Sequence, residues 1–276
     1  MQRLPLVPIA VLTLSVGAMV GQARAMQRTS PASPIHAKSQ QELADYNADY
    51  SLNGGSAMEH AATSFAQKYP ASELRLYLFA RAMREYQREN NPTGIQRMGE
   101  KVLELDPDHA IALVLTATAL ADGLGPGDPD RDKKIAEIKK DANRALQTVS
   151  ARFVPPAGVT PQQAAVYRTT LQAMAYSALG MTNLKTGDYN EAEKNLKQAA
   201  DLDKIHPDPY VWYHLALAQD HRKKYPAALS SVEQALQLAS SNPDLQKLAE
   251  TEHQRLSRLA NRGKDSRDPG GAPPPQ

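Results

Sequence analysis

The stretch from Ala173 to Asp203 limits the fold of this chain more than any other part of the sequence. It holds two runs in which apolar or small residues recur every three or four positions, and this spacing predicts two helices that each bury one face. Gly187 interrupts the pattern between the runs and supplies the backbone freedom that a tight turn requires. Gly180 and Ala192 are small where the two helices cross, so the backbones can approach closely. The stretch therefore predicts a closely packed helix–turn–helix unit.

The same pattern returns from Pro209, which lies 36 residues after Ala173. The residues expected to pack the repeats together are Tyr176, Leu179, Gly180, Ala192, Leu196 and Ala199 in the first copy, and Trp212, Leu215, Ala216, Ala228, Val232 and Ala235 in the second. This pattern resembles the tetratricopeptide repeat, whose signature is a large residue, then Leu-Gly, and later Ala, a bulky residue and Ala. Two positions depart from it, because Asn183 stands where Tyr is usual and Lys204 where a closing Pro is usual. The resemblance implies a solenoid of stacked helix pairs that holds other proteins.

Less regular units are expected upstream. A first helix is predicted over residues 41–50, followed by a helix that Ser56 caps, with Glu59 three residues later to complete a capping box. A second unit is predicted over residues 76–109, where Gly99 occupies a position that is usually bulky. The next unit begins one repeat length later, which is 34 residues in this family.

The third unit departs from the family. Residues 122–132 form a Gly- and Pro-rich insertion, so the second helix of the unit comes late. A long helix is then predicted over residues 161–186, with Thr160 as its cap and Gln163 three residues beyond. Asn242 and Pro243 introduce a last helix that seals the open end. The fold class is therefore expected to be all-α: a tetratricopeptide-repeat solenoid of about five helix–turn–helix units plus a C-terminal capping helix, over residues 40–261.

The ends of the chain have a different composition. Residues 1–25 have a basic start, an apolar run and Ala23-Arg24-Ala25, and they predict a signal peptide cleaved after Ala25. The alternative is an uncleaved membrane anchor, but Pro5 and Pro8 leave a run shorter than the ~20 residues that span a bilayer. Residues 26–39 and 262–276 are expected to be a disordered leader and tail. The chain is thus expected to be exported, either periplasmic or secreted, and it is similar to exported bacterial members of the family without an assigned activity.

Composition and local motifs restrict the chemistry. Outside residues 1–25, 30 Lys and Arg residues face 30 Asp and Glu residues, which argues against a nucleic-acid binder. The chain has no Cys, and no local pattern of a nucleophile, a phosphate loop or a zinc-peptidase helix is present. Three carboxylates at residues 128–132 begin like a calcium loop, but Lys133 and Lys139 occupy essential positions, so they are read as helix-capping acids. No catalytic residue, metal site or cofactor is predicted.

The histidines leave one enzymatic alternative open. His214 and His221 share a helix face on the order of 10 Å apart, which is too far for one metal ion without a third element. His206 and His253 approach them only if the fold brings them together. A metal-dependent hydrolase built on these histidines is therefore retained as a minor alternative.

The resemblance also implies a binding surface, because the first helix of each repeat lines the concave side of such a solenoid. Carried over to this chain, the partner-binding groove would contain Tyr77, Arg84, Arg88, Ile111, Val114, Thr118, Met174, Ser177, Met181, Lys185, Tyr210, Tyr213, Leu217 and His221. Apolar and aromatic groups beside scattered cations suit an extended or helical peptide with some acidic side chains. Ser177 and Met181 stand where chaperone-binding members carry clamp residues, so that subtype is not expected.

One stripe of the groove has two interpretations. Arg81, Arg84 and Arg88 lie on one helix, either as a docking point for an acidic peptide or as a solvated face paired with Glu85 and Glu89. The leading hypothesis for the whole chain is an exported, non-enzymatic adaptor for a protein or peptide partner, with no nucleic acid bound and no transmembrane span after signal cleavage. A self-associating scaffold of the cell envelope is the second alternative.

Overall fold

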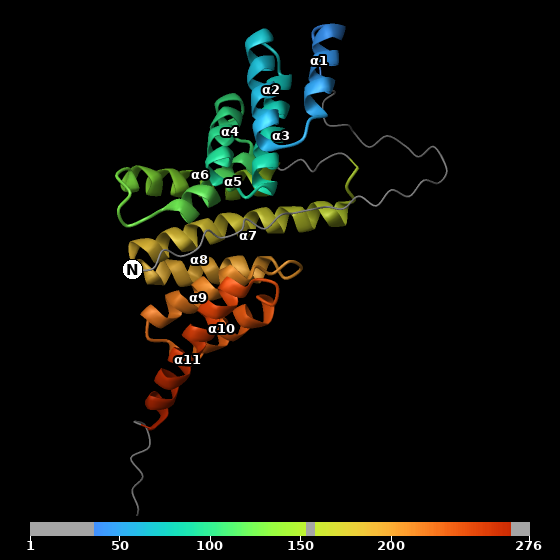
Figure 1. Cartoon of the computed structure of the whole chain (residues 1–276). Coiled ribbons are helices and arrows are strands. Elements are labelled where there is room, and N and C mark those ends of the chain that lie inside the picture. The colour runs from blue at the N-terminus through green and yellow to red at the C-terminus, as the bar shows by residue number, and fades with distance from the viewer. Residues whose placement is uncertain (1–35, 153–157, 266–276) are drawn as a thin grey trace, which may run out of the picture.

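The computed structural model describes residues 36–152 and 158–265, and in this part of the chain it contains eleven helices and no strand (Figure 1). The helices are α1 (Gln40–Tyr50), α2 (Gly55–Lys68), α3 (Leu74–Arg88), α4 (Pro92–Leu105), α5 (Ala110–Gly123), α6 (Arg131–Arg152), α7 (Pro161–Thr186), α8 (Tyr189–Leu202), α9 (Pro209–His221), α10 (Tyr225–Leu238) and α11 (Pro243–Asp265). The predicted signal peptide and residues 26–35 of the predicted leader lie outside the described residues.

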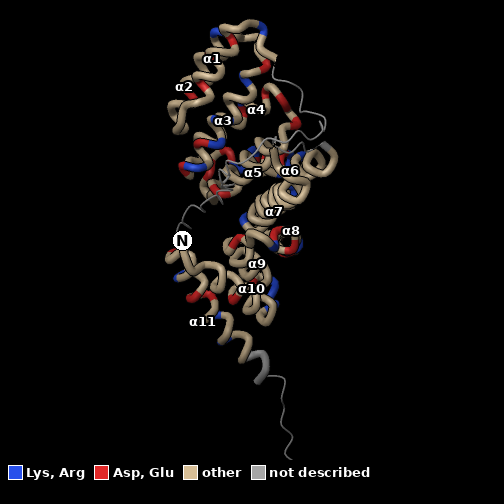
Figure 2. Tube along the Cα trace, turned by 90° about the vertical axis from the view of Figure 1, so that its right-hand side faces the viewer, with Lys and Arg blue, Asp and Glu red and all other residues tan. Residues whose placement is uncertain are grey.

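The helices stack in chain order into an elongated body, with α1 at one end and α11 at the other (Figure 1). Each helix packs on the next one, so α1 to α10 form five successive pairs and α11 covers the last pair. This architecture confirms the predicted all-α helical solenoid. Basic and acidic residues are interspersed along the stack (Figure 2). No helix of the described part is both long enough and apolar enough to cross a membrane.

The core is a series of apolar clusters that merge along the stack. One cluster joins α1 to α5 and includes the fully buried Met58 and Leu78, and the next joins α5, α6 and α7. Ile111 and Met174 pack against both clusters, so the core does not break at the unusual third unit. The solenoid is therefore continuous from its first helix pair to the long helix α7.

Close approach of the paired helices depends on small residues. A Cβ placed on Gly180 of α7 would lie 2.6 Å from Cγ of Leu196 and 3.1 Å from its backbone nitrogen, so only glycine fits this crossing with α8. Gly99 has the same role in α4, where a Cβ would collide with the Thr116 hydroxyl of α5. Helix α5 packs so close to position 99 that the bulky residue usual there in the family would not fit.

The ends of α7 follow the sequence signals. Thr160 accepts a hydrogen bond from the backbone N–H of Gln163, and the Gln163 side chain accepts one from the backbone N–H of Thr160. This confirms the predicted cap. At the other end Gly187 adopts φ 84°, a left-handed conformation that suits glycine and closes the helix. Between these ends α7 is the longest helix described, and it extends past its neighbours in Figure 1.

The start of α2 differs from the predicted capping box, which is wrong. The cap residue is Gly54 with φ 89°, and the Ser56 side chain makes no capping bond. Glu59 is unavailable because its carboxylate binds the guanidinium of Arg97 and the hydroxyl of Tyr86.

Two carboxylates from α3 serve the start of α2 instead. The backbone N–H of Gly55 donates to Oε1 of Glu89 at 2.6 Å, and that of Gly54 donates to Oε2 of Glu85 at 3.4 Å. Free N–H groups and the helix dipole both favour negative charge at a helix start. The cap of α2 therefore comes from a neighbouring helix, which no local motif reveals.

The insertion of the third unit is fastened to α7. Asp128 accepts a hydrogen bond from the backbone N–H of Asp130 at 3.2 Å and forms an ion pair with Lys134 at 2.6 Å. Nη2 of Arg131 donates to the carbonyl oxygen of Lys185 at 2.7 Å. Asp128 thus stabilises the turn before α6, and its bond to the Asp130 amide lies just outside the helix. At the far end α11 runs to Asp265, three residues beyond the predicted start of the tail at residue 262.

Replacing Gly180 by Val is expected to destabilise the protein by about 2 kcal/mol, because the added methyl groups force α8 away from α7. The urea midpoint measured by circular dichroism reports the change. Gly123→Val is the matched control, since a Cβ there meets no atom within 4 Å. Equal midpoints for the two variants would contradict the close-crossing argument.

Candidate functional site

The first helices of the pairs form one side of the solenoid. Apart from the contact of the capping helix α11 with α9, contacts between helices that are not neighbours in the chain join α1 to α3, α5 to α7 and α7 to α9. All of these are the first helices of their pairs, so we define the surface that they carry as the inner face. A ligand that runs along the inner face meets several repeats at once.

The structure corrects the groove prediction for Val114, Met181, Tyr210 and Tyr213, which are all buried. Val114 and Met181 belong to the cluster of α5, α6 and α7, and the two tyrosines belong to the cluster of α9, α10 and α11. The Tyr210 hydroxyl accepts a hydrogen bond from the Asn242 side chain at 2.9 Å. These positions face a neighbouring helix, because one residue of error in register turns a side chain by about 100°.

Several other predicted groove residues are partly used by the fold. Ile111, Met174 and Leu217 are half-buried against the core, and the Thr118 hydroxyl donates to the carbonyl oxygen of Val114 at 2.9 Å. The exposed His221 ring stacks on Tyr189 of α8, with ring centroids 4.0 Å apart. The remaining members with accessible side chains are Tyr77, Arg84, Arg88, Ser177 and Lys185.

The residues predicted to pack the last two repeats lie where helices meet. All except Tyr176 and Trp212 are buried. Those two are half-buried against the cluster formed by Ala192, Leu196 and Leu215 with their neighbours on α8 and α9. The repeat signature thus corresponds to the interface between α7, α8, α9 and α10.

The arginine stripe of α3 separates into paired and unpaired members. Arg81 and Arg88 both form ion pairs with Glu85, whose side chain is buried. Burial works to raise the pKa of Glu85, but Arg88, Arg81 and the Gly54 amide outweigh it and hold the pKa below its usual range. Arg84 forms no ion pair with any residue that the structure describes. Two of the three arginines are therefore paired as predicted, but with Glu85 alone, because Glu89 accepts a hydrogen bond from the Gly55 amide.

Arg84 is half-buried, and its charge acts on three rings from other parts of the stack. Its positive charge opposes the burial that raises the pKa of Tyr46 in α1 to about 12, and it opposes the same effect on Tyr167 in α7. It also adds to the burial that lowers the pKa of His109, the cap residue of α5. All three rings are therefore neutral near pH 7, so none of them carries a charge that would neutralise Arg84.

A second polar cluster lies where α5, α7 and α9 meet. Nζ of Lys185 donates to the carbonyl oxygens of Ala121 at 2.6 Å and Asp122 at 2.9 Å, which closes the end of α5. Burial raises the pKa of Asp122 to about 7, although Lys185 opposes this. Burial also raises the pKa of Asp208 to about 6. Lys185 is therefore committed to the fold rather than presented to a ligand.

The histidines do not converge. His214 is buried, and burial together with Lys185 lowers its pKa to about 4. His221 stacks on Tyr189, and Nε2 of His253 lies 3.4 Å from Glu233. Within residues 36–152 and 158–265 no three His, Cys, Asp or Glu side chains come together as a metal ion would need.

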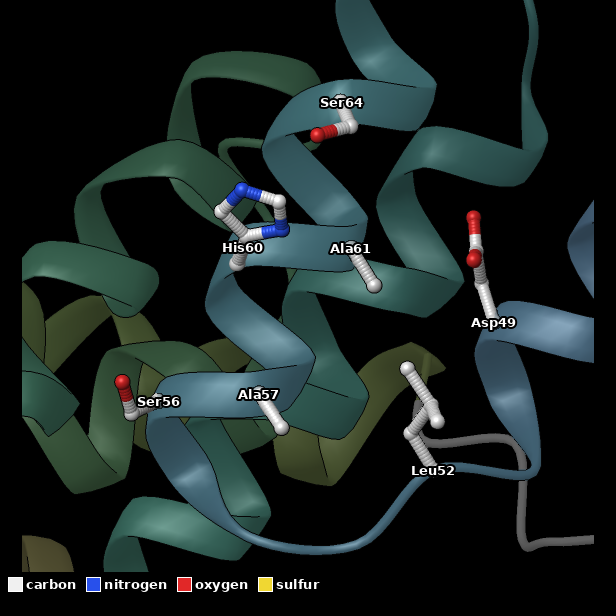
Figure 3. A pocket seen from close by; sticks show the side chains of 7 residues that line it. All are labelled: Asp49, Leu52, Ser56, Ala57, His60, Ala61 and Ser64. Atoms are coloured by element: carbon white, nitrogen blue, oxygen red, sulfur yellow. The ribbon is translucent and has the colours of Figure 1, made fainter.

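Sequence reasoning missed an open hollow of about 790 Å³ between α1 and α2 (Figure 3). It is lined by Asp49, Leu52, Ser56, Ala57, His60, Ala61 and Ser64. Ala57 and Ala61 of α2 point towards Asp49 and Leu52 at the end of α1. The hollow exists because α1 packs loosely on α2, and neither helix carries a residue pattern that signals it.

Comparison with known families identifies one match. Residues 177–243 match a family model described as a tetratricopeptide repeat. The matched segment covers the end of α7, all of α8, α9 and α10, and the first residue of α11. A search of curated proteins finds none that matches this chain.

Replacing Asp122 by Asn is expected to stabilise the protein above pH 7 by more than about 1 kcal/mol. The unfolded carboxyl titrates near 3.8 and the folded one near 7, so the native state keeps a proton that the unfolded state loses. The stability that this proton confers is present below about pH 4 and is lost as the pH rises through 7. Urea midpoints at pH 5 and pH 8 test this.

The matched control is Asp130→Asn, which changes an exposed carboxylate in the same insertion. The urea midpoint of this variant should equal that of the native protein at pH 5 and at pH 8. An Asp122→Asn variant that is less stable than the native protein at pH 8 would show that the ionised carboxylate is needed.

Proposed function

Because this chain is a tetratricopeptide-repeat protein, we propose that it is an exported, non-enzymatic adaptor that binds a protein or peptide partner on its inner face. Tetratricopeptide repeats commonly mediate protein–protein interaction. The observation that carries the proposal is the inner face itself, on which first helices from several repeats present exposed or half-buried side chains such as Tyr77, Arg84 and Ser177.

The composition of the inner face favours a peptide segment as the ligand. The exposed Tyr77 ring offers apolar area that loses little conformational freedom on binding, and aromatic anchors of this kind dominate the energy of interfaces. The half-buried Arg84 and Ser177 supply polar contacts beside it. An extended segment lying across α3, α5 and α7 would contact these groups together.

Export rests on the sequence of residues 1–25. If they form a signal peptide, the mature protein starts at Met26, and N-terminal sequencing of the protein from the producing cell will read Met-Gln-Arg. Ala25→Asp removes the small residue that the peptidase requires, so the uncleaved precursor should accumulate in the membrane fraction. The control is Gln27→Asn, which lies after the cleavage point, so this variant should be processed normally. A mature protein that still begins at Met1 would refute export by cleavage.

A site-specific photocrosslinker tests the binding surface. Benzoyl-phenylalanine replaces Tyr77 on the inner face, and in a matched variant it replaces Lys101, which is exposed on the second helix α4. The proposal expects one defined protein to be crosslinked from position 77 and not from position 101. Crosslinks only between copies of this chain would favour the self-associating scaffold, and equal labelling from both positions would contradict a specific inner-face site.

A further inference from the structure

We propose that Arg84 is the anchor for a carboxylate of the partner, so that the ligand of the inner face is an acidic peptide segment. This inference rests on the proposed function and adds the chemistry that the partner must carry. The site consists of Arg84 and the exposed Tyr77, which lie on one face of α3. The charge of Arg84 also acts on Tyr46 of α1, on His109 at the start of α5 and on Tyr167 of α7, so the site draws on four repeats.

The charge of Arg84 is unbalanced in the described structure. Its neighbours on the same helix face, Arg81 and Arg88, share the buried carboxylate of Glu85, and the ring of Tyr50 lies 5.7 Å from the Arg81 guanidinium. Glu85 and Glu89 are in turn held by the first amides of α2. The acids of α3 are therefore occupied, and Arg84 is left as a half-buried cation without a counterion among the described residues.

A half-buried cation of this kind favours an anionic ligand. Loss of water around a charge is costly unless an opposite charge replaces it. The guanidinium presents a planar fork of donors that matches the two oxygens of a carboxylate. Asp106 acts on the pKa of His109 but forms no ion pair with Arg84. Among the described residues, an incoming carboxylate therefore meets no acid that is already paired with Arg84.

The surrounding rings strengthen such a pair and restrict its shape. Tyr46 is buried, and Tyr167 and His109 are half-buried, so the guanidinium is partly shielded from water and a charge pair there is screened less than on an open surface. Tyr77 is 41% exposed, and its ring acts on the pKa of Tyr46. Tyr77 precedes Arg84 by seven residues on α3, so the two lie on one helix face about 10 Å apart, and Tyr77 offers an apolar surface on the same side as the anchored carboxylate. The ligand is therefore an acidic residue flanked by apolar ones, whether the carboxylate is a side chain or a chain end.

Parallel selection of peptides tests this inference with the whole mature protein, from Met26 onward. A random library of twelve-residue peptides is selected against the native protein and against Arg84→Gln. We expect peptides selected by the native protein to contain Asp or Glu at one recurrent position and to bind Arg84→Gln about ten- to hundredfold more weakly, the range for a charged hydrogen-bonded pair. Arg84→Lys keeps the charge without the fork and should give an intermediate affinity.

Two controls separate binding from folding and from net charge. Lys101→Gln removes one positive charge from the exposed surface of α4 and should leave the affinity within about twofold. The thermal midpoint of Arg84→Gln should be equal to or above that of the native protein, because an unpaired half-buried cation contributes no ion pair to lose. A lower midpoint would assign Arg84 to the fold and overturn the proposal.

The outcomes distinguish the inference from the function on which it rests. Selected peptides that lack carboxylates, or that bind Arg84→Gln as well as they bind the native protein, would overturn the anchor and leave the inner-face adaptor standing. A failure to select any peptide with either protein would overturn both. Each selected peptide is also made as a C-terminal amide, and loss of affinity on amidation would assign the carboxylate to the chain end rather than to a side chain.

Discussion

The close crossing of paired helices is the constraint on which the rest of the structure depends. At Gly180 the backbone of α8 comes so near α7 that no side chain fits between them. Alanines such as Ala192 and Ala228 allow similar approaches and are fully buried. Because each pair is thin, successive pairs stack closely, with first helices in contact between α1 and α3 and from α5 through α7 to α9. That stacking creates the inner face.

The cap of α2 connects this packing to the charge on the inner face. The first amides of α2 are served by Glu85 and Glu89 from α3 rather than by a residue of α2 itself. Glu85 is therefore buried, and Arg81 and Arg88 turn to it. Because Glu85 and Glu89 are used in capping α2, Arg84 remains without an ion-pair partner in the described part of the chain. The binding role proposed for Arg84 thus follows from how the neighbouring acids are used.

Features encoded in short segments were predictable from the sequence. The caps of α7 depend only on residues within a few positions of Thr160 and Gly187, so the sequence predicts them. The repeat signature around Gly180 lies within a single helix pair and is predictable for the same reason. The cap of α2 was not predictable, since Glu85 and Glu89 are about thirty residues away from it in the chain. The pairing of Glu59 with Arg97 is equally remote in sequence, and it removed the acid on which the predicted capping box relied.

The inner face was predictable in outline but not residue by residue. The family resemblance implies a ligand on the first helices. Helix α9, however, is apolar on most sides, so its sequence pattern does not separate the residues that pack in the core from those that could line a groove. Tyr210 and Tyr213 are consequently buried under α10 and α11 although their sequence suited a groove. The hollow between α1 and α2 depends on how loosely a terminal helix packs, which no spacing of residues records.

Nitrogen-15 NMR of the arginine side chains tests the central claim most directly. The mature protein is labelled at arginine and titrated with a peptide that it has selected, and the spectrum of Arg84→Lys identifies the Arg84 signal by its absence. The account predicts that the Nε–Hε signal of Arg84 moves to saturation while those of Arg81 and Arg88 stay in place, because Glu85 already holds them. A bound peptide that leaves the Arg84 signal unchanged would contradict it.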